Sequence, residues 1–137
     1  MRSAPRILIV EDEDVLAENL KTFLGRSSPD VRTVPDGERA LAMLDAFTPD
    51  VVVMDLALPG IDGLDAYSEI VRRRGRRVAC VMITGHALES IAANACARGI
   101  RHLLCKPFSL AELQLQVDAS ARESGDDPYA PYGGAPG

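Results

Sequence analysis

The chain is 137 residues long, which fits one domain with a full hydrophobic core. Its residues are 47% hydrophobic and 26% charged, as in ordinary soluble globular proteins, and its net charge of −5 argues against non-specific binding to nucleic acid. It has no apolar run near the roughly 18 residues of a membrane span, and its start, MRSAPRILIVED, lacks the pattern of a secretory signal. We therefore expect neither membrane contact nor direct nucleic-acid binding.

The first quarter of the chain predicts a strand, a helix and a second strand. Arg6–Val10, RILIV, is a short apolar strand that stops at a run of acidic residues. Apolar side chains then recur at helical spacing until Gly25. Their positions are Leu16, Leu20, Phe23 and Leu24. Val31–Val34 is the second predicted strand.

The next segment predicts a helix and a buried strand. Asp36 is placed to cap the helix, and Thr48-Pro49 ends it. Its inward-facing residues are expected to be Leu41, Leu44 and Phe47. Val51–Met54, VVVM, is apolar without alternation, which is typical of a strand buried on both faces of a parallel sheet.

The second half of the chain repeats the alternation. A helix is expected from about Leu64 to Arg74, and Val78–Ile83 is the fourth strand. The following helix stops at Gly99, and His102–Leu104 is a short fifth strand. Ser109–Glu112 has the capping-box form S-x-x-E and opens the last helix.

This alternation predicts an α/β fold, with a parallel sheet, right-handed crossovers and helices on both faces. The pattern alone leaves the strand order open. Residues 5–122 are expected to form the folded domain. Residues 123–137 are rich in Gly and Pro and are expected to form a disordered tail or linker.

Polar residues follow four of the predicted strands directly. They are Glu11, Asp12, Asp55, Thr84 and Lys106. Because the carboxyl ends of parallel strands share one edge, these side chains are expected to converge. Converging carboxylates repel one another, and a compact set of oxygen donors suits Mg²⁺. With the metal bound, one carboxylate can act as a nucleophile toward a phosphoryl group, while the lysine and the hydroxyl neutralise its charge.

Each of these residues also has a purely structural interpretation. Asp55 and Thr84 can be turn residues, and Lys106 can be a surface lysine at a helix approach. Glu11 and Asp12 can favour the start of the helix that follows through its dipole. All of them acting this way together is the less favoured interpretation.

The segments RILIVEDED, VVVMDLALPGIDGLD, VMITGHA and LLCKPFS together resemble the motifs of bacterial response-regulator receiver domains. The resemblance spans residues 5 to 122. It implies a flavodoxin-like (βα)5 three-layer sandwich with a five-stranded parallel sheet in the order 2-1-3-4-5. It also implies that Asp55 accepts a phosphoryl group from a histidine kinase or a histidine phosphotransfer protein, which switches a surface used for protein contacts.

The resemblance also implies roles for the other residues of this edge. Asp12 matches a direct Mg²⁺ ligand, Glu11 acts through water, and Ala57 offers its backbone carbonyl to the metal. Thr84 matches the switch hydroxyl. Lys106 matches the lysine that pairs with the phosphoryl group, and the Lys106-Pro107 peptide bond is expected to be cis.

One position departs from the family. Receiver domains usually carry Tyr or Phe three residues before the lysine, and this chain has Leu103. A leucine cannot swing a ring between solvent and core, so the usual coupling of the threonine to an aromatic side chain is in doubt. His86 and Ala57 flank the site and are expected to tune how fast water reaches the acyl phosphate.

Other functions stay open at this stage. The chain can be the regulatory fragment of a longer regulator, with an unknown output target, or a receiver-like binding module that is never phosphorylated. Phospho-aspartyl hydrolases need a second acid two residues after the nucleophile, where this chain has Ala57, so we expect no turnover enzyme. A phosphorylation-dependent dimer is a further expectation.

The remaining signals have simpler interpretations. The cysteines Cys80, Cys96 and Cys105 are odd in number and lack a CxxC pair, which fits a reducing cytoplasm better than a disulfide framework or a zinc site. The arginine run over residues 72–77 is expected to favour a helix C-terminus. His102 is expected to be a surface residue at a strand end.

Overall fold

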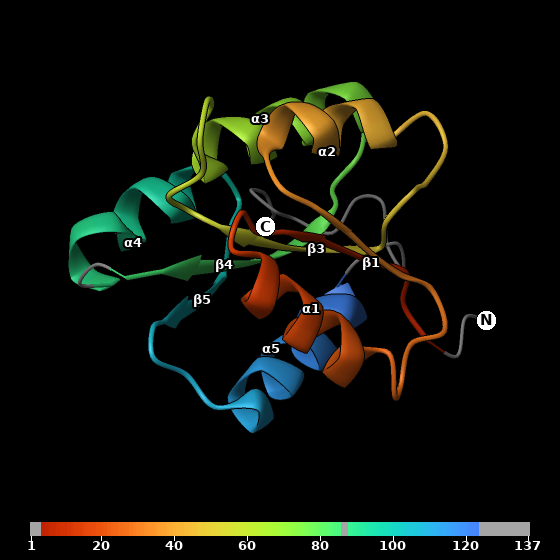
Figure 1. Ribbon diagram of the computed structural model, residues 1–137. Helices are drawn as coiled ribbons and strands as arrows, with labels where there is room; N and C mark the ends of the chain where they lie inside the picture. The colour runs from red at the N-terminus through yellow and green to blue at the C-terminus, as the bar shows by residue number, and fades with distance from the viewer. Residues whose placement is uncertain (1–3, 86–87, 124–137) are drawn as a thin grey trace.

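The computed structural model describes residues 4–85 and 88–123, which form one sheet of parallel strands with helices on both faces (Figure 1). The strands are β1 (Ile7–Val10), β2 (Val31–Val34), β3 (Val51–Asp55), β4 (Ala79–Thr84) and β5 (His102–Cys105). The helices are α1 (Asp14–Leu24), α2 (Gly37–Met43), α3 (Gly63–Arg74), α4 (Leu88–Ala97) and α5 (Leu110–Glu123). The order β2-β1-β3-β4-β5 confirms the flavodoxin-like prediction.

Alternate residues of each central strand enter two different hydrophobic clusters. Leu8, Val52 and Met82 pack toward α2 and α3, whereas Ile9, Val53 and Val81 pack toward α1 and α5. Side chains on a strand point alternately to its two faces, so a sheet covered on both sides must be apolar at every position. This explains the unbroken apolar runs in the sequence. Figure 1 shows the two helix layers on either side of the sheet.

Several helix boundaries confirm the sequence predictions. The Asp36 carboxylate accepts a hydrogen bond from the Arg39 N–H at 2.8 Å and caps α2. Ser109 and Glu112 form the predicted capping box, each side chain accepting the other residue's N–H. The chain also turns at Gly99 with a φ of 91°, a left-handed conformation that favours glycine.

Helix α2 is shorter than the sequence predicted. It ends at Met43, although Leu44 and Phe47 are buried as expected. The N–H groups of Ala46 and Phe47 both bond to the Met43 carbonyl, so the chain closes in turns instead of continuing the helix. The expectations for His86 and for residues 124–137 lie outside the described residues.

Among residues 4–85 and 88–123, each helix is too short or too polar to traverse a lipid bilayer.

The cysteine Cys80 lies in the core at 3% exposure, and burial raises the pKa of its thiol. It behaves as a small core residue, as its apolar sequence context predicted.

Candidate functional site

The carboxyl ends of β1, β3, β4 and β5 bring the predicted site residues to one edge of the sheet. Asp55 is the last residue of β3 and pairs in register with Ile83 of β4, while Thr84 pairs with Cys105 of β5. The Lys106 N–H donates to the Thr84 carbonyl at 2.8 Å, so Lys106 directly continues the edge of the sheet. The positions of these side chains therefore follow from the strand register.

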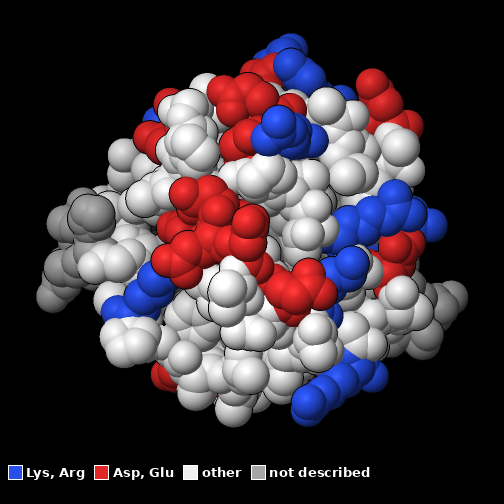
Figure 2. Space-filling model, in the orientation of Figure 1, with Lys and Arg blue, Asp and Glu red and all other residues white. Residues whose placement is uncertain are grey.

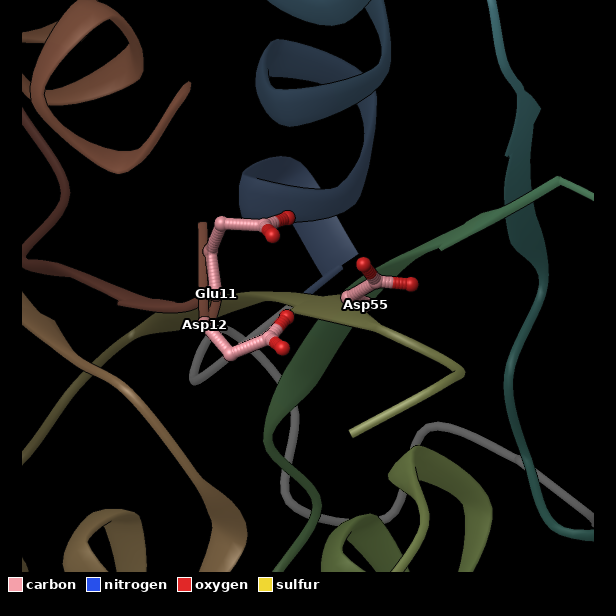
Figure 3. Close-up of side chains that lie close together, drawn as sticks. All are labelled: Glu11, Asp12 and Asp55. Atoms are coloured by element: carbon pink, nitrogen blue, oxygen red, sulfur yellow. The ribbon is translucent and has the colours of Figure 1, made fainter. Parts of the chain in front are cut away.

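Three carboxylates form a compact cluster at this edge. Glu11, Asp12 and Asp55 each offer an oxygen atom, and these atoms lie within 4.8 Å of one another (Figure 3). Glu11 and Asp55 are buried at 3% and 5% exposure, whereas Asp12 is exposed. The cluster is therefore buried at Glu11 and Asp55 and accessible to solvent at Asp12. Figure 2 shows acidic side chains gathered over the region where α1 begins.

Both oxygens of Asp55 have partners within the chain. Its Oδ1 accepts a hydrogen bond from the Ala57 N–H at 3.1 Å, and its Oδ2 accepts one from the Lys106 ammonium at 3.1 Å. These contacts fix the orientation of the Asp55 carboxylate, which is itself buried. The Lys106 side chain stays one-third exposed and faces the site from the solvent side.

Only one of the two carboxylate oxygens of Glu11 has a hydrogen-bond partner among the described residues. Its Oε2 accepts a hydrogen bond from the Glu13 N–H at 3.0 Å, while its buried Oε1 has no hydrogen-bond partner among the described residues. Burial is the main cause that raises the pKa of Glu11 to about 7, and the negative charge of Asp55 adds to it. A buried, unpaired carboxylate oxygen is costly, so this atom is suited to bind a cation.

Lys106 supplies the positive charge nearest to the cluster. Burial alone would lower the pKa of its ammonium, but the hydrogen bond and the charge of Asp55 outweigh burial, and the pKa is raised. Lys106 is therefore protonated at neutral pH and pairs with Asp55. The Lys106-Pro107 peptide bond is cis, as the family resemblance predicted.

Thr84 lies at the end of β4 and is buried at 1% exposure. The next residue, Gly85, borders a pocket of about 930 Å³ that Lys106 also lines. Apolar side chains of α1 and of the loop after β5 make up most of its other walls. Thr84 therefore ends β4 at the same edge of the sheet as Asp55, and an apolar hollow lies beside Lys106.

Gly63 is a site residue that the sequence reasoning missed. A Cβ atom added at this position would lie 2.6 Å from the Asp55 carbonyl oxygen and 3.0 Å from the Leu56 Cα. The Gly63 N–H also donates to the Leu56 carbonyl at 2.9 Å. Only glycine lets the start of α3 approach the backbone of Asp55 this closely.

The donor set fits a small hard divalent cation. Mg²⁺ prefers carboxylate and carbonyl oxygens and usually keeps several waters, so it needs few protein ligands. The cluster offers carboxylates alone, and one of their buried oxygens lacks a hydrogen-bond partner among the described residues. The protein thus presents an acidic cluster of the kind that binds such an ion.

Comparison with known proteins assigns the family. Residues 7–118 match the model of the response regulator receiver domain. The chain belongs to the response-regulator receiver family. The motifs that suggested this family therefore lie on the fold and at the sheet edge that the family resemblance implied.

Relatives with curated descriptions support this assignment. The chain is 34% identical over 119 residues to the two-component response regulator PhoP of Pseudomonas aeruginosa, which covers 87% of this chain and 52% of PhoP. It is 35% identical over 121 residues to the sensory transduction protein RegX3 of Mycobacterium tuberculosis, covering 88% and 52% of the two chains. This receiver chain therefore spans about half the length of these relatives.

Solved structures show the same fold. The receiver domain of the Francisella response regulator 1452 has a TM-score of 0.76 at 25% identity, covering 86% of this chain and 97% of that one. NtrX from Brucella abortus has a TM-score of 0.78 at 30% identity, covering 87% of this chain and 27% of NtrX. A CheY-like receiver domain from Methanospirillum hungatei, at 21% identity and a TM-score of 0.79, is similar in fold.

Proposed function

We propose that Asp55 of this receiver domain accepts a phosphoryl group from the phosphohistidine of a histidine kinase or a histidine phosphotransfer protein. One juxtaposition carries the proposal. The Asp55 carboxylate lies within 4.8 Å of two further carboxylates and 3.1 Å from the Lys106 ammonium. This places a nucleophile between a cation-binding cluster and a fixed positive charge, the surroundings that phosphoryl transfer requires.

Mg²⁺ is the proposed cofactor, held by Glu11, Asp12, Asp55 and the Ala57 backbone carbonyl. When bound, it neutralises charge on the phosphoryl oxygens and on the cluster. One Asp55 oxygen forms a bond to phosphorus as the phosphorus–nitrogen bond of the donor histidine breaks. The electron pair of that bond returns to the imidazole, which takes up a proton.

Lys106 and Thr84 are proposed to stabilise the transferred group. The Lys106 ammonium, already hydrogen-bonded to Asp55, can pair with a phosphoryl oxygen once the carboxylate is esterified. The Thr84 hydroxyl lies on the neighbouring strand and can donate to another oxygen. Both residues act on the phosphorylated form and lengthen its lifetime.

The phosphorylated domain is proposed to switch a surface used for protein contacts. Leu103 is partly buried and packs against the cluster that lies toward α2 and α3. The switch in this chain therefore works without a swinging aromatic ring at position 103, through the loops that follow β4 and β5. The output target is a protein, an attached domain or a second copy of the receiver.

The alternatives are less favoured by the site. A phospho-aspartyl hydrolase needs an acid where this chain has the exposed Ala57, so we propose no turnover activity. A module that is never phosphorylated would not need Lys106 hydrogen-bonded to Asp55. A regulatory fragment is compatible with the same chemistry, because the chain spans about half of its relatives. The match to the relative named DNA-binding response regulator MtrA likewise covers only 54% of that protein.

Intact-mass measurement after incubation with acetyl phosphate and Mg²⁺ tests the proposal. We expect the wild-type chain to gain one phosphoryl group, and we expect Asp55→Asn to gain none. Asp45→Asn, which changes an exposed aspartate outside the cluster, is the matched control and should gain the group as the wild type does. A phosphoryl group that persists in Asp55→Asn would reject the assignment of the acceptor.

A further inference from the structure

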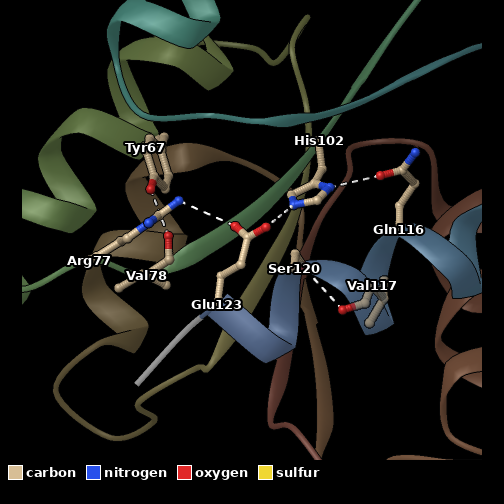
Figure 4. Close-up of polar contacts among 8 residues, drawn as sticks. All are labelled: Tyr67, Arg77, Val78, His102, Gln116, Val117, Ser120 and Glu123. Atoms are coloured by element: carbon tan, nitrogen blue, oxygen red, sulfur yellow. Dashed lines mark hydrogen bonds and ion pairs between the residues drawn. The ribbon is translucent and has the colours of Figure 1, made fainter. Parts of the chain in front are cut away.

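A second polar cluster lies at the opposite edge of the sheet from Asp55. It joins Arg77, which precedes β4, and His102, which begins β5, to Gln116 and Glu123 of α5 (Figure 4). His102 was expected to be a surface residue, but its side chain is only 14% exposed. That expectation is wrong because the last turns of α5 cover it.

The contacts of this cluster are short and connect distant parts of the chain. His102 Nε2 lies 3.1 Å from Glu123 Oε2, and His102 Nδ1 lies 2.9 Å from Gln116 Oε1. Arg77 donates to the other Glu123 oxygen at 3.3 Å, and its side chain is 10% exposed. Glu123 is thus held by two groups that bear or can bear positive charge.

Arg77 is itself held in place by its neighbour along the chain. The Tyr67 hydroxyl of α3 donates to the Val78 carbonyl at 2.6 Å in the core, one residue after Arg77. The guanidinium therefore extends from a fixed backbone. Because cations near a helix C-terminus also interact favourably with its dipole, Arg77 is well placed at the end of α5.

The end of α5 has little apolar anchoring of its own. Leu113 and Val117 are completely buried, but the residues after Val117 that face the sheet are small. Ser120 is buried and satisfies its hydroxyl on the Val117 carbonyl at 3.0 Å, and Ala121 is only partly buried. Small side chains bury little apolar surface, so the polar cluster must supply much of what holds this turn.

We propose that Arg77, His102, Gln116 and Glu123 form a latch that fixes the last turn of α5 against the sheet. Glu123 is the last residue of α5, and the chain continues to residue 137. The latch therefore holds the C-terminal end of α5 in one position against the start of β5. The latch thus ties the end of α5 to β5, the strand that Lys106 follows directly.

Amide hydrogen exchange of the complete chain tests the latch. In His102→Leu we expect the amides of residues 120–123 to exchange about tenfold faster, the change that losing one charge-assisted hydrogen bond makes in a local opening equilibrium. Glu123→Gln, which keeps the shape but loses the charge, should also speed exchange there. In the double variant, the change in the free energy of local opening should be smaller than the sum of the two single changes, because both residues belong to one latch.

Two controls separate the latch from general destabilisation and from the phosphorylation chemistry. Asp118→Asn removes an exposed carboxylate of α5 whose hydrogen-bond partner among the described residues is Gln114 at 2.9 Å, and this variant should exchange as the wild type does. The amides of β1 should be unchanged in every variant. Unchanged rates at residues 120–123 in both latch variants, or equal acceleration in β1, would overturn the proposal. Both latch variants should gain a phosphoryl group from acetyl phosphate as the wild type does. If no protein gained the group, the wild type included, this result would count against Asp55 as the acceptor and not against the latch.

Discussion

Glu11 is the residue at which burial and charge repulsion act most strongly in the acidic cluster. Its pKa of about 7 lies above its ordinary value of 4.5, so the folded chain keeps a proton that the unfolded chain loses between these two pH values. The contribution of Glu11 therefore lowers stability as pH rises from about 4.5 to 7, and the full penalty applies above pH 7. A bound cation would remove this penalty.

Replacing Glu11 by glutamine should stabilise the metal-free protein at pH 8. Glutamine keeps the side-chain oxygen that accepts the Glu13 N–H but removes the buried charge. We expect a gain of about 2–3 kcal/mol in the free energy of unfolding at pH 8, which shrinks toward zero near pH 4.5. Urea unfolding in the presence of a chelator at both pH values measures this. Equal stability of the two proteins at pH 8 would show that Glu11 carries no such penalty.

The close approach of α3 to β3 fixes the geometry of Asp55 at the scale of the elements. Gly63→Ala places a methyl group 2.6 Å from the Asp55 carbonyl oxygen, where backbone must move to admit it. We expect a loss of about 2–3 kcal/mol in stability, together with slower phosphorylation because the carboxylate is displaced. Urea unfolding and the rate of phosphoryl gain measure the two effects.

Gly85→Ala is the matched control for this substitution. A Cβ at Gly85 would meet no atom within 4 Å, and its φ is not positive. Its stability should stay within about 0.5 kcal/mol of the wild type, as for surface substitutions in general. If Gly63→Ala were as stable as Gly85→Ala, the contact between α3 and the Asp55 backbone would be less tight than described.

The sequence predicts elements best where local chemistry decides them. Unbroken apolar runs such as Val51–Met54 identify buried strands, and Asp36 and Ser109 mark helix starts, because these signals act within a few residues. The end of α2 at Met43 and the burial of His102 depend on packing between distant segments, which no local pattern records. Strand order likewise came from the family resemblance.

The polar residues of the candidate site were predictable from the sequence, whereas its energetics and the role of Gly63 were not. Glu11, Asp55 and Lys106 were identified because they follow predicted strands, and a parallel sheet places such residues at one edge. The unpaired Glu11 oxygen and the steric role of Gly63 appear only when the distances are known. Both depend on the exact approach of backbone segments, which sequence spacing does not determine.

At the scale of the whole molecule, cation binding and folding stability should be linked. A ligand that binds only the folded chain adds about 2.7 kcal/mol at a concentration one hundred times its dissociation constant. We therefore expect Mg²⁺ at pH 8 to raise the melting temperature of the wild type by several degrees. Asp12→Asn should lose most of this rise, because it removes the exposed carboxylate of the cluster. Asp118→Asn should retain it.

The sheet divides the functions of the molecule between its two edges. The acidic cluster and Lys106 lie at the carboxyl ends of the strands, while the latch lies at the amino ends of β4 and β5. β5 is the element common to both, since His102 begins it and Lys106 follows its last residue. Lys106 at one edge and the latch at the other are thus connected by one short strand.

The central claim is that Asp55 is the phosphoryl acceptor of this receiver. Reduction of the phosphorylated chain with borohydride converts an aspartyl phosphate into homoserine, and peptide mass spectrometry then locates the changed residue. The account predicts homoserine at position 55, only after treatment with both acetyl phosphate and Mg²⁺. Homoserine at another aspartate, or a phosphoryl group that resists borohydride and maps to a serine, threonine or histidine, would contradict it.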